Sequence, residues 1–161
     1  MQDFTRLLQR LSDSAIDFVI VGGYAAVTHG SSMVTRDLDI CAVLSTETVT
    51  KLRSVLAEWN PKHRMTPTKL SFLDFPLSGS LENLYLQTDV GVIDILSSIL
   101  GVGDFQRLKA SAEDFEIGGR VYHVISLDDL IAAKEALGRE KDLLAAKELR
   151  AIAAKRNKHG K

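Results

Sequence analysis

The fold of this chain is decided by residues 18–44, which read FVIVGGYAAVTHGSSMVTRDLDICAVL. The apolar start of this stretch predicts a strand over residues 18–21 that is covered on both faces of its sheet. Gly22 and Gly23 then allow a sharp turn and a close approach of the backbone to a ligand, because no Cβ is in the way. A short helix through Val27 is predicted to follow, with its free N–H groups directed toward that ligand. A plain strand-to-helix turn without a ligand is the alternative interpretation.

A second strand is predicted over residues 36–40, which read RDLDI. Because successive side chains of a strand point to opposite faces, Asp37 and Asp39 lie on one face and Arg36 on the other. Two carboxylates side by side in an apolar strand cost free energy unless positive charge lies between them. Mg²⁺ is the simplest such charge, because hard divalent ions prefer carboxylate oxygens. This strand therefore predicts a metal site.

The combination of these motifs resembles the nucleotidyltransferase superfamily. The string GGYAAVTHG…TRDLDI is similar to the small prokaryotic branch related to abortive-infection and toxin–antitoxin nucleotidyltransferases. The family pattern includes a third carboxylate on a later strand, and the run VGVIDIL supplies it as Asp94. The resemblance covers roughly residues 17–152. It implies an α+β (α/β-type) fold, with a mixed β-sheet flanked by helices and with C-terminal helices packed over the site.

The resemblance implies an enzyme that moves a nucleoside monophosphate from an NTP to an acceptor hydroxyl and releases pyrophosphate. Asp37, Asp39 and Asp94 would be its catalytic residues and would hold two Mg²⁺ ions about 3.5–4 Å apart, with Mn²⁺ as the alternative ion. Asp94 also interrupts the apolar pattern of its strand, which is typical of functional positions. It is therefore the candidate base for the proton of the attacking hydroxyl.

A second similar segment lies near the C-terminus, where KEALGREKDLLAAKEL resembles the Lys…Gly-Arg-x-Lys-Asp segment of the family. In the family the lysine helps to bind the nucleotide phosphates, and it matches Lys134. Asp142 matches the aspartate, and it either belongs to the site or supports Lys134 or Arg139. The predicted nucleotide-binding residues are Gly22, Gly23, Ser31, Arg36, Lys134 and Asp142.

Three polar residues around the second strand have two interpretations each. Ser31 either donates a hydrogen bond to phosphate or forms only a turn. Arg36 either reaches the substrate or pairs with a structural carboxylate. His29 either touches the nucleotide or caps carbonyl groups at the end of its helix.

The remainder of the chain alternates between helices and strands. Periodicity predicts helices over residues 3–13, 46–59, 104–112 and 126–137, with a last one from 140, and strands over 81–87, 90–96, 115–117 and 121–125. Trp59 is predicted to lie in the core. Residues 61–80 are interpreted as a solvated loop with a short strand near residues 70–72, and a flap that meets an anionic substrate is the alternative.

Composition limits the classes of protein that fit. The 161 residues are 45% hydrophobic and 25% charged, which is typical of a globular protein. One domain is expected over residues 1–161, with a core over about 14–125 and a helical part over about 126–156. A net charge of −1 gives no overall basic field, so no DNA partner is indicated. Without a secretion signal or an apolar run that could span a bilayer, a cytoplasmic location with no membrane partner is expected.

The sequence leaves the acceptor open. A tRNA 3′ end, a hydroxyl of a partner protein and a small molecule such as an aminoglycoside all remain, and no stretch selects one base of the NTP. The alternative function is a catalytically weak nucleotidyltransferase-like antitoxin, or a nucleotide-binding partner, in a toxin–antitoxin or phage-defence system. A third hypothesis is an unrelated α/β domain with a structural metal, which requires the glycine turn and Asp94 to be coincidences.

Overall fold

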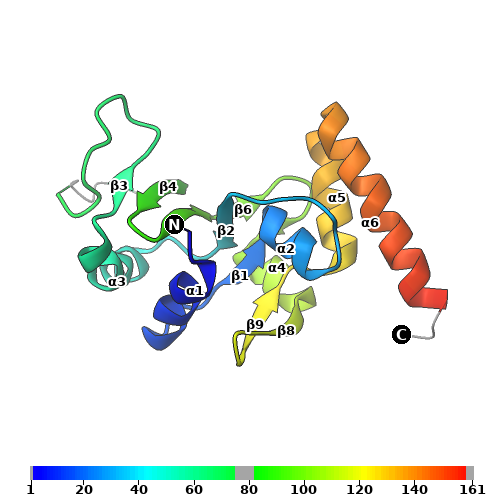
Figure 1. Ribbon diagram of the computed structural model, residues 1–161, viewed down its shortest axis with the longest axis horizontal. Coiled ribbons are helices and arrows are strands. Elements are labelled where there is room, and N and C mark those ends of the chain that lie inside the picture. The colour runs from blue at the N-terminus through cyan, green and yellow to red at the C-terminus, as the bar shows by residue number, and fades with distance from the viewer. Residues whose placement is uncertain (1, 75–81, 159–161) are drawn as a thin grey trace.

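The computed structural model describes residues 2–74 and 82–158. Its centre is a mixed seven-stranded sheet in the order β3-β4-β5-β2-β1-β9-β8, with helices around it (Figure 1). The strands of this sheet are β1 (Val19–Val21), β2 (Asp37–Cys41), β3 (Lys62–His63), β4 (Asn83–Thr88), β5 (Gly91–Leu96), β8 (Glu113–Ile117) and β9 (Arg120–Val124), and β6 (Ser98–Ile99) pairs separately with β7 (Gly103–Asp104). The helices are α1 (Phe4–Asp13), α2 (Gly22–Thr28), α3 (Thr46–Leu56), α4 (Phe105–Ser111), α5 (Leu127–Leu137) and α6 (Glu140–Lys158), and the 3₁₀ turn η1 (Ala57–Trp59) follows α3. The predicted α+β fold with a mixed sheet is confirmed.

Strand β2 lies in the middle of the sheet, antiparallel to β1 and parallel to β5. Its alternating pattern buries Leu38 and Ile40 and leaves Asp37 and Asp39 half-buried on the other face. The pairing of β2 with β5 places Asp94 directly opposite Asp39. Because directly opposite residues of paired strands share a face, sheet register alone brings these two carboxylates side by side.

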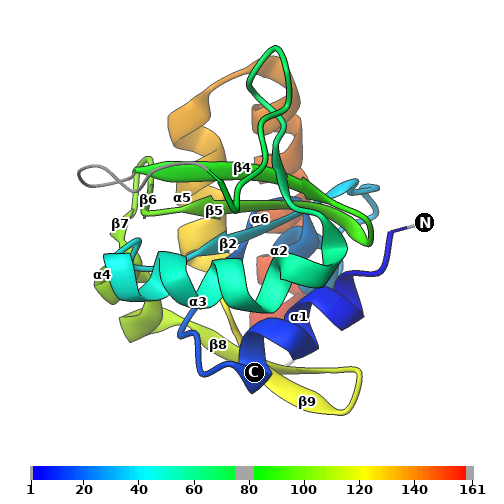
Figure 2. The same cartoon turned by 90° about the vertical axis from the view of Figure 1, so that its left-hand side faces the viewer.

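Helices α1 and α3 lie side by side, next to the strands of the sheet (Figure 2). The apolar stripe that α1 buries consists of Leu7, Leu8 and Leu11. Ser45 precedes helix α3 and caps it, because its Oγ accepts a hydrogen bond from the N–H of Thr48 (3.1 Å). The helix predicted over residues 46–59 ends as an α-helix at Leu56 and continues as η1 to Trp59, which is buried as predicted.

Helices α5 and α6 form an antiparallel pair at the end of the molecule opposite β3 and β4 (Figure 1). Ser126 precedes helix α5 and caps it, because its Oγ accepts a hydrogen bond from the N–H of Asp129 (3.1 Å). Gly138 follows the last residue of α5 with a φ of +68°, the left-handed conformation that favours glycine, and the chain reverses into α6. No helix within residues 2–74 or 82–158 is both long and apolar enough to cross a membrane.

Residues 61–74 are only in part the solvated loop that the sequence predicted, because residues 65 and 67–70 are exposed but the segment also pairs with the sheet and contributes to the core. Lys62 and His63 form the edge strand β3, which pairs with β4, and Phe72 is buried. The short strand expected near residues 70–72 does not form, and Ser71 makes only an isolated bridge with Lys62. Pairing with the sheet edge and burial of one aromatic ring outweigh the local preference of prolines and charges for a loop. Residues 75–80 of the predicted loop, and Leu81 of the predicted strand, lie outside the described residues.

Candidate active site

Gly22 places the corner between β1 and α2 directly against Asp39. Its φ is +67°, and a Cβ built on it would overlap Oδ2 of Asp39 and lie 3.0 Å from the Asp39 Cβ. A Cβ on Gly23 would lie 2.9 Å from Oγ1 of Thr35. Both positions therefore leave room only for glycine, and at Gly22 a carboxylate occupies the space.

Strands β2 and β5 bring three carboxylates together. One oxygen from each of Asp37, Asp39 and Asp94 lies within 4.8 Å of the other two. Asp94 is buried, and the other two are half-buried. The residues that the sequence analysis assigned to a single metal site from two separate strands are thus neighbours in space.

Burial and mutual repulsion oppose the ionisation of this group. Burial, followed by the charges of Asp94 and Asp37, raises the pKa of Asp39 to about 7, against the opposing charges of Arg64 and Lys134. Burial also raises the pKa of Asp94.

Two oxygens of the group lack a donor. Oδ1 of Asp39 and Oδ1 of Asp94 are buried and have no hydrogen-bond partner within the described part of the chain. Buried polar atoms are normally paired, so each of these oxygens calls for a positive partner. Three carboxylates with such oxygens fit a hard divalent cation such as Mg²⁺.

Arg64 is a residue of this site that the sequence analysis missed. Its Nη2 donates a hydrogen bond to Oδ2 of Asp94, in an ion pair whose side chains are 24% and 9% exposed. Arg64 follows β3 and is distant from Asp94 in the sequence, so no local pattern links them. The basic character of residues 62–69 is the basis for interpreting this segment as a flap that meets an anionic substrate. It does not single out Arg64.

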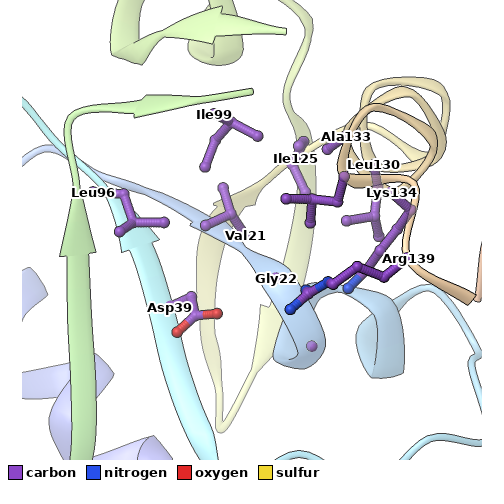
Figure 3. Close-up of a pocket in the computed structure, with 12 residues that line it drawn as sticks. Val21, Gly22, Asp39, Leu96, Ile99, Ile125, Leu130, Ala133, Lys134 and Arg139 are labelled. Atoms are coloured by element: carbon purple, nitrogen blue, oxygen red, sulfur yellow. The ribbon is translucent and has the colours of Figure 1, made fainter. Parts of the chain in front are cut away.

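A cavity of about 220 Å³ opens beside Asp39, between the sheet and α5 (Figure 3). Lys134 and Arg139 extend from the C-terminal end of α5 and the residues after it toward Gly22, while aliphatic side chains gather on the other wall (Figure 3). The lining residues are Val21, Gly22, Gly23, Asp39, Leu96, Ile99, Ile125, Leu130, Ala133, Lys134, Leu137 and Arg139. The predicted packing of a C-terminal helix over the site is therefore observed for α5.

Asp142, in the first turn of α6, holds the two cations of this cavity. The carboxylate is 2% exposed and accepts hydrogen bonds from Nε of Arg139 at 2.6 Å and from Nη2 at 3.4 Å. Nζ of Lys134 lies 4.0 Å from its Oδ1. The hydrogen bond from Arg139 lowers the pKa of Asp142, so this carboxylate is ionised at neutral pH. Asp142 does not line the cavity itself, which matches the interpretation that it supports Lys134 and Arg139.

Three other candidates lie outside the cavity lining. Ser31 Oγ donates to Glu148 of α6 at 2.5 Å. Arg36 is exposed and forms no ion pair with another described residue. Nε2 of His29 lies 2.7 Å from the carbonyl oxygen of Ile125, which follows the end of β9. Contact of Ser31 or Arg36 with a nucleotide stays a prediction.

The chain matches the model of a protein family over residues 1–160, and the description of that family is "Nucleotidyl transferase of unknown function (DUF2204)". No curated protein matches the sequence significantly. The family match confirms the predicted resemblance to nucleotidyltransferases. A link to toxin–antitoxin systems is not part of this description and stays a prediction.

Several solved structures are similar to this fold. One is the lincosamide antibiotic adenylyltransferase LnuA with lincomycin bound, with a TM-score of 0.62 and 15% identity over 92% of this chain and 95% of that chain. Another is a candidate nucleotidyltransferase from Thermotoga maritima, with a TM-score of 0.57 and 19% identity over 96% of each chain. A third is the antibiotic-resistance factor ANT(2″)-Ia, with a TM-score of 0.52 and 13% identity over 98% of this chain and 94% of that chain. At these identities the likeness shows a shared fold.

Proposed function

This chain belongs to the family of nucleotidyl transferases that matches it over residues 1–160, and from that premise we propose a Mg²⁺-dependent transfer of a nucleoside monophosphate from an NTP to an acceptor hydroxyl. The observation that carries the proposal is the convergence of Asp37, Asp39 and Asp94 beside a cavity lined by two cations. Carboxylates that gather in this way need a positive partner, and a phosphate-bearing substrate needs the same ion.

The three carboxylates would hold Mg²⁺, with Mn²⁺ as the substitute. The buried Oδ1 atoms of Asp39 and Asp94, which lack a donor among the described residues, are the oxygens that we assign to it. When bound, the ion supplies Lewis-acid stabilisation of the charge on the transferring phosphoryl group and on the leaving pyrophosphate. Gly22 contributes by leaving space for the Asp39 carboxylate next to the backbone.

The cavity between the sheet and α5 is the proposed nucleotide site. Lys134 and Arg139 supply positive charge for the phosphates. Asp142, which does not line the cavity, holds both side chains through its contacts with Arg139 and Lys134. The aliphatic wall suits the base and the ribose, because ligand pockets are mostly apolar with a few polar groups that set orientation. Gly22 and Gly23 line the same cavity and allow the phosphates a close approach.

Asp94 is the proposed base. It accepts the proton of the acceptor hydroxyl while the hydroxyl oxygen forms a bond to the α-phosphorus of the NTP. The bond from that phosphorus to the bridging oxygen breaks, and pyrophosphate leaves with the electron pair. Placement of the groups and neutralisation of charge supply most of the rate in reactions of this type.

The fold does not select the acceptor. The lincosamide adenylyltransferase of similar fold is named for an antibiotic acceptor, so small molecules with free hydroxyl groups are the first class to test. A tRNA 3′ end and a hydroxyl of a partner protein are the second and third.

Transfer of α-labelled nucleotide from each NTP to these three acceptor classes tests the proposal. The wild type is expected to label one class in the presence of Mg²⁺, and Asp39→Asn is expected to abolish labelling because it removes one ligand charge. Asp89→Asn is the matched control, since Asp89 is an exposed aspartate beyond the end of β4. Labelling by Asp39→Asn at the rate of the wild type would contradict the proposal.

A further inference from the structure

Arg64 reaches the carboxylate group from the edge strand β3 and is not a lining residue of the cavity. In the sheet, β3 and β4 lie on one side of β5 and β2, whereas β1 lies on the other (Figure 1). Val21 of β1 lines the cavity. Arg64 follows β3, and its Nη2 donates to Oδ2 of Asp94. Lys134 and Arg139, by contrast, reach the site from α5 and the residues after it. The site therefore has cations from two parts of the fold. Lys134 and Arg139 line the nucleotide cavity, and Arg64 does not.

Arg64 makes three contacts besides Asp94, one through its backbone and two through its side chain. Its backbone N–H donates to the carbonyl of Tyr85 at 3.0 Å, which fixes the chain to β4. The guanidinium carbon lies 5.4 Å from the centre of the Tyr85 ring, and Nη1 lies 3.1 Å from Sδ of Met65. Tyr85 is also the residue of β4 that pairs in register with Asp94. The guanidinium and the carboxylate are thus positioned by the same pair of strands.

We infer that Arg64 is a positioning residue for the metal site: it binds Oδ2 of Asp94 and so aims the free Oδ1 at the ion. This inference rests on the proposed function. A carboxylate that ligates a metal is commonly held by a hydrogen bond to its other oxygen, and loss of that partner weakens the metal site. Asp94 has this arrangement, because Oδ2 is occupied by Arg64 and Oδ1 is buried without a donor among the described residues.

Arg64 could instead compete with the metal ion for the carboxylates, and its fixed position argues against that alternative. A guanidinium that merely took the place of the ion would need to leave when the ion binds, and it would lie between the three carboxylates. Arg64 instead contacts a single oxygen of Asp94 and, within the described part of the chain, donates no hydrogen bond to Asp37 or Asp39. The two cations can therefore occupy separate oxygens of one carboxylate.

Binding of Mn²⁺ to the full chain tests this inference without the transfer reaction. The electron paramagnetic resonance signal of free Mn²⁺ measures the binding. Arg64→Gln is expected to weaken Mn²⁺ binding about 10–100-fold. Should the Gln variant fail to fold, Arg64→Met, which suits a partly buried position, is expected to weaken Mn²⁺ binding by the same factor. Arg64→Lys is expected to recover part of the affinity, because a single N–H···O contact needs a charge but not a planar fork.

Lys69→Gln is the matched control. It removes the same charge from the same segment, but Lys69 is exposed and its Nζ donates to Gln87 at 3.1 Å, so Mn²⁺ binding should stay as in the wild type. Equal or tighter Mn²⁺ binding by Arg64→Gln or Arg64→Met would overturn the inference and leave the proposed function intact. Failure of the wild type to bind Mn²⁺ would overturn both.

Discussion

The carboxylate of Asp39 lies directly against the backbone of Gly22, in space that a Cβ on this glycine would fill. The contact joins the end of β1 to the middle strand β2, and it connects the glycine motif of the sequence to the Asp-x-Asp motif. Two motifs that are separated by a helix and a loop are therefore parts of one local structure.

Gly22→Ala is expected to damage the site more than the fold. Alanine at a φ of +67° costs about 1–2 kcal/mol, and its Cβ would push Asp39 away from its neighbours. A displacement of this kind is expected to lower the transfer rate about 100-fold. Gly119→Ala is the control, because Gly119 has a φ of +84° and nothing within 4 Å of its built Cβ. Denaturation should show the cost of the left-handed backbone in both variants, with a further loss in Gly22→Ala from the displaced carboxylate, and equal activities would contradict the role of Gly22.

The pH dependence of metal binding follows from the raised pKa of Asp39. The folded, metal-free protein keeps a proton on Asp39 up to about pH 7, whereas the unfolded chain releases it near its ordinary value. This group therefore contributes stability that is present at low pH and is lost as the pH rises through about 7. Mg²⁺ needs the ionised carboxylate, so it should raise the melting temperature more at about pH 8 than at about pH 6.

Asp39→Asn provides the comparison for this measurement. Asparagine does not titrate, so the stability of the metal-free variant should lose this pH dependence, and Mg²⁺ should have little effect at either pH. A stabilisation of the wild type by Mg²⁺ that is equal at both pH values would contradict the assignment of Asp39.

Lys134→Gln should weaken the binding of the NTP. Loss of one charge next to the phosphates is expected to raise KM for the NTP about tenfold, which corresponds to about 1.4 kcal/mol. Asp142 keeps its hydrogen bonds from Arg139 in this variant, so the fold should remain. Lys141→Gln serves as the control, because Lys141 is exposed and does not line the cavity. Steady-state kinetics in which both variants resemble the wild type would exclude Lys134 from the nucleotide site.

Phe72→Ala tests whether the segment after β3 is part of the core. Phe72 is 1% exposed, and its truncation is expected to cost about 3 kcal/mol in the free energy of unfolding. Leu70→Ala, at a position that is 45% exposed, should change stability by no more than about 0.5 kcal/mol. Urea denaturation of both variants measures the difference, and a cost at Phe72 as small as that at Leu70 would show that the segment is not packed.

The convergence of Asp37, Asp39 and Asp94 could be predicted from the sequence because it depends on short-range rules. The alternation of side chains along a strand assigns Asp37 and Asp39 to one face, and the interruption of an apolar strand identifies Asp94. The glycine turn and the family resemblance then supply the order of the elements. The alternation, the interruption and the glycine turn are each contained within a few consecutive residues, and the resemblance, which extends over most of the chain, joins Asp94 to the other two.

The role of Arg64 and the shape of the cavity could not be predicted in this way. Arg64 meets Asp94 only because β3 pairs with β4, and β4 with β5, and the sequence of residues 61–74 does not indicate that edge strand. The cavity similarly combines Ile99, Ile125 and Leu130 from separate elements. Each of these apolar residues has an ordinary local pattern, so its position next to the carboxylates is set by tertiary packing.

Anomalous diffraction from crystals grown with Mn²⁺ and a non-hydrolysable NTP tests the central claim most directly. We expect a Mn²⁺ peak about 2.1 Å from an oxygen of each of Asp37, Asp39 and Asp94, with the phosphates between this peak and Lys134. A Mn²⁺ peak elsewhere, or none between these three carboxylates, would contradict the account.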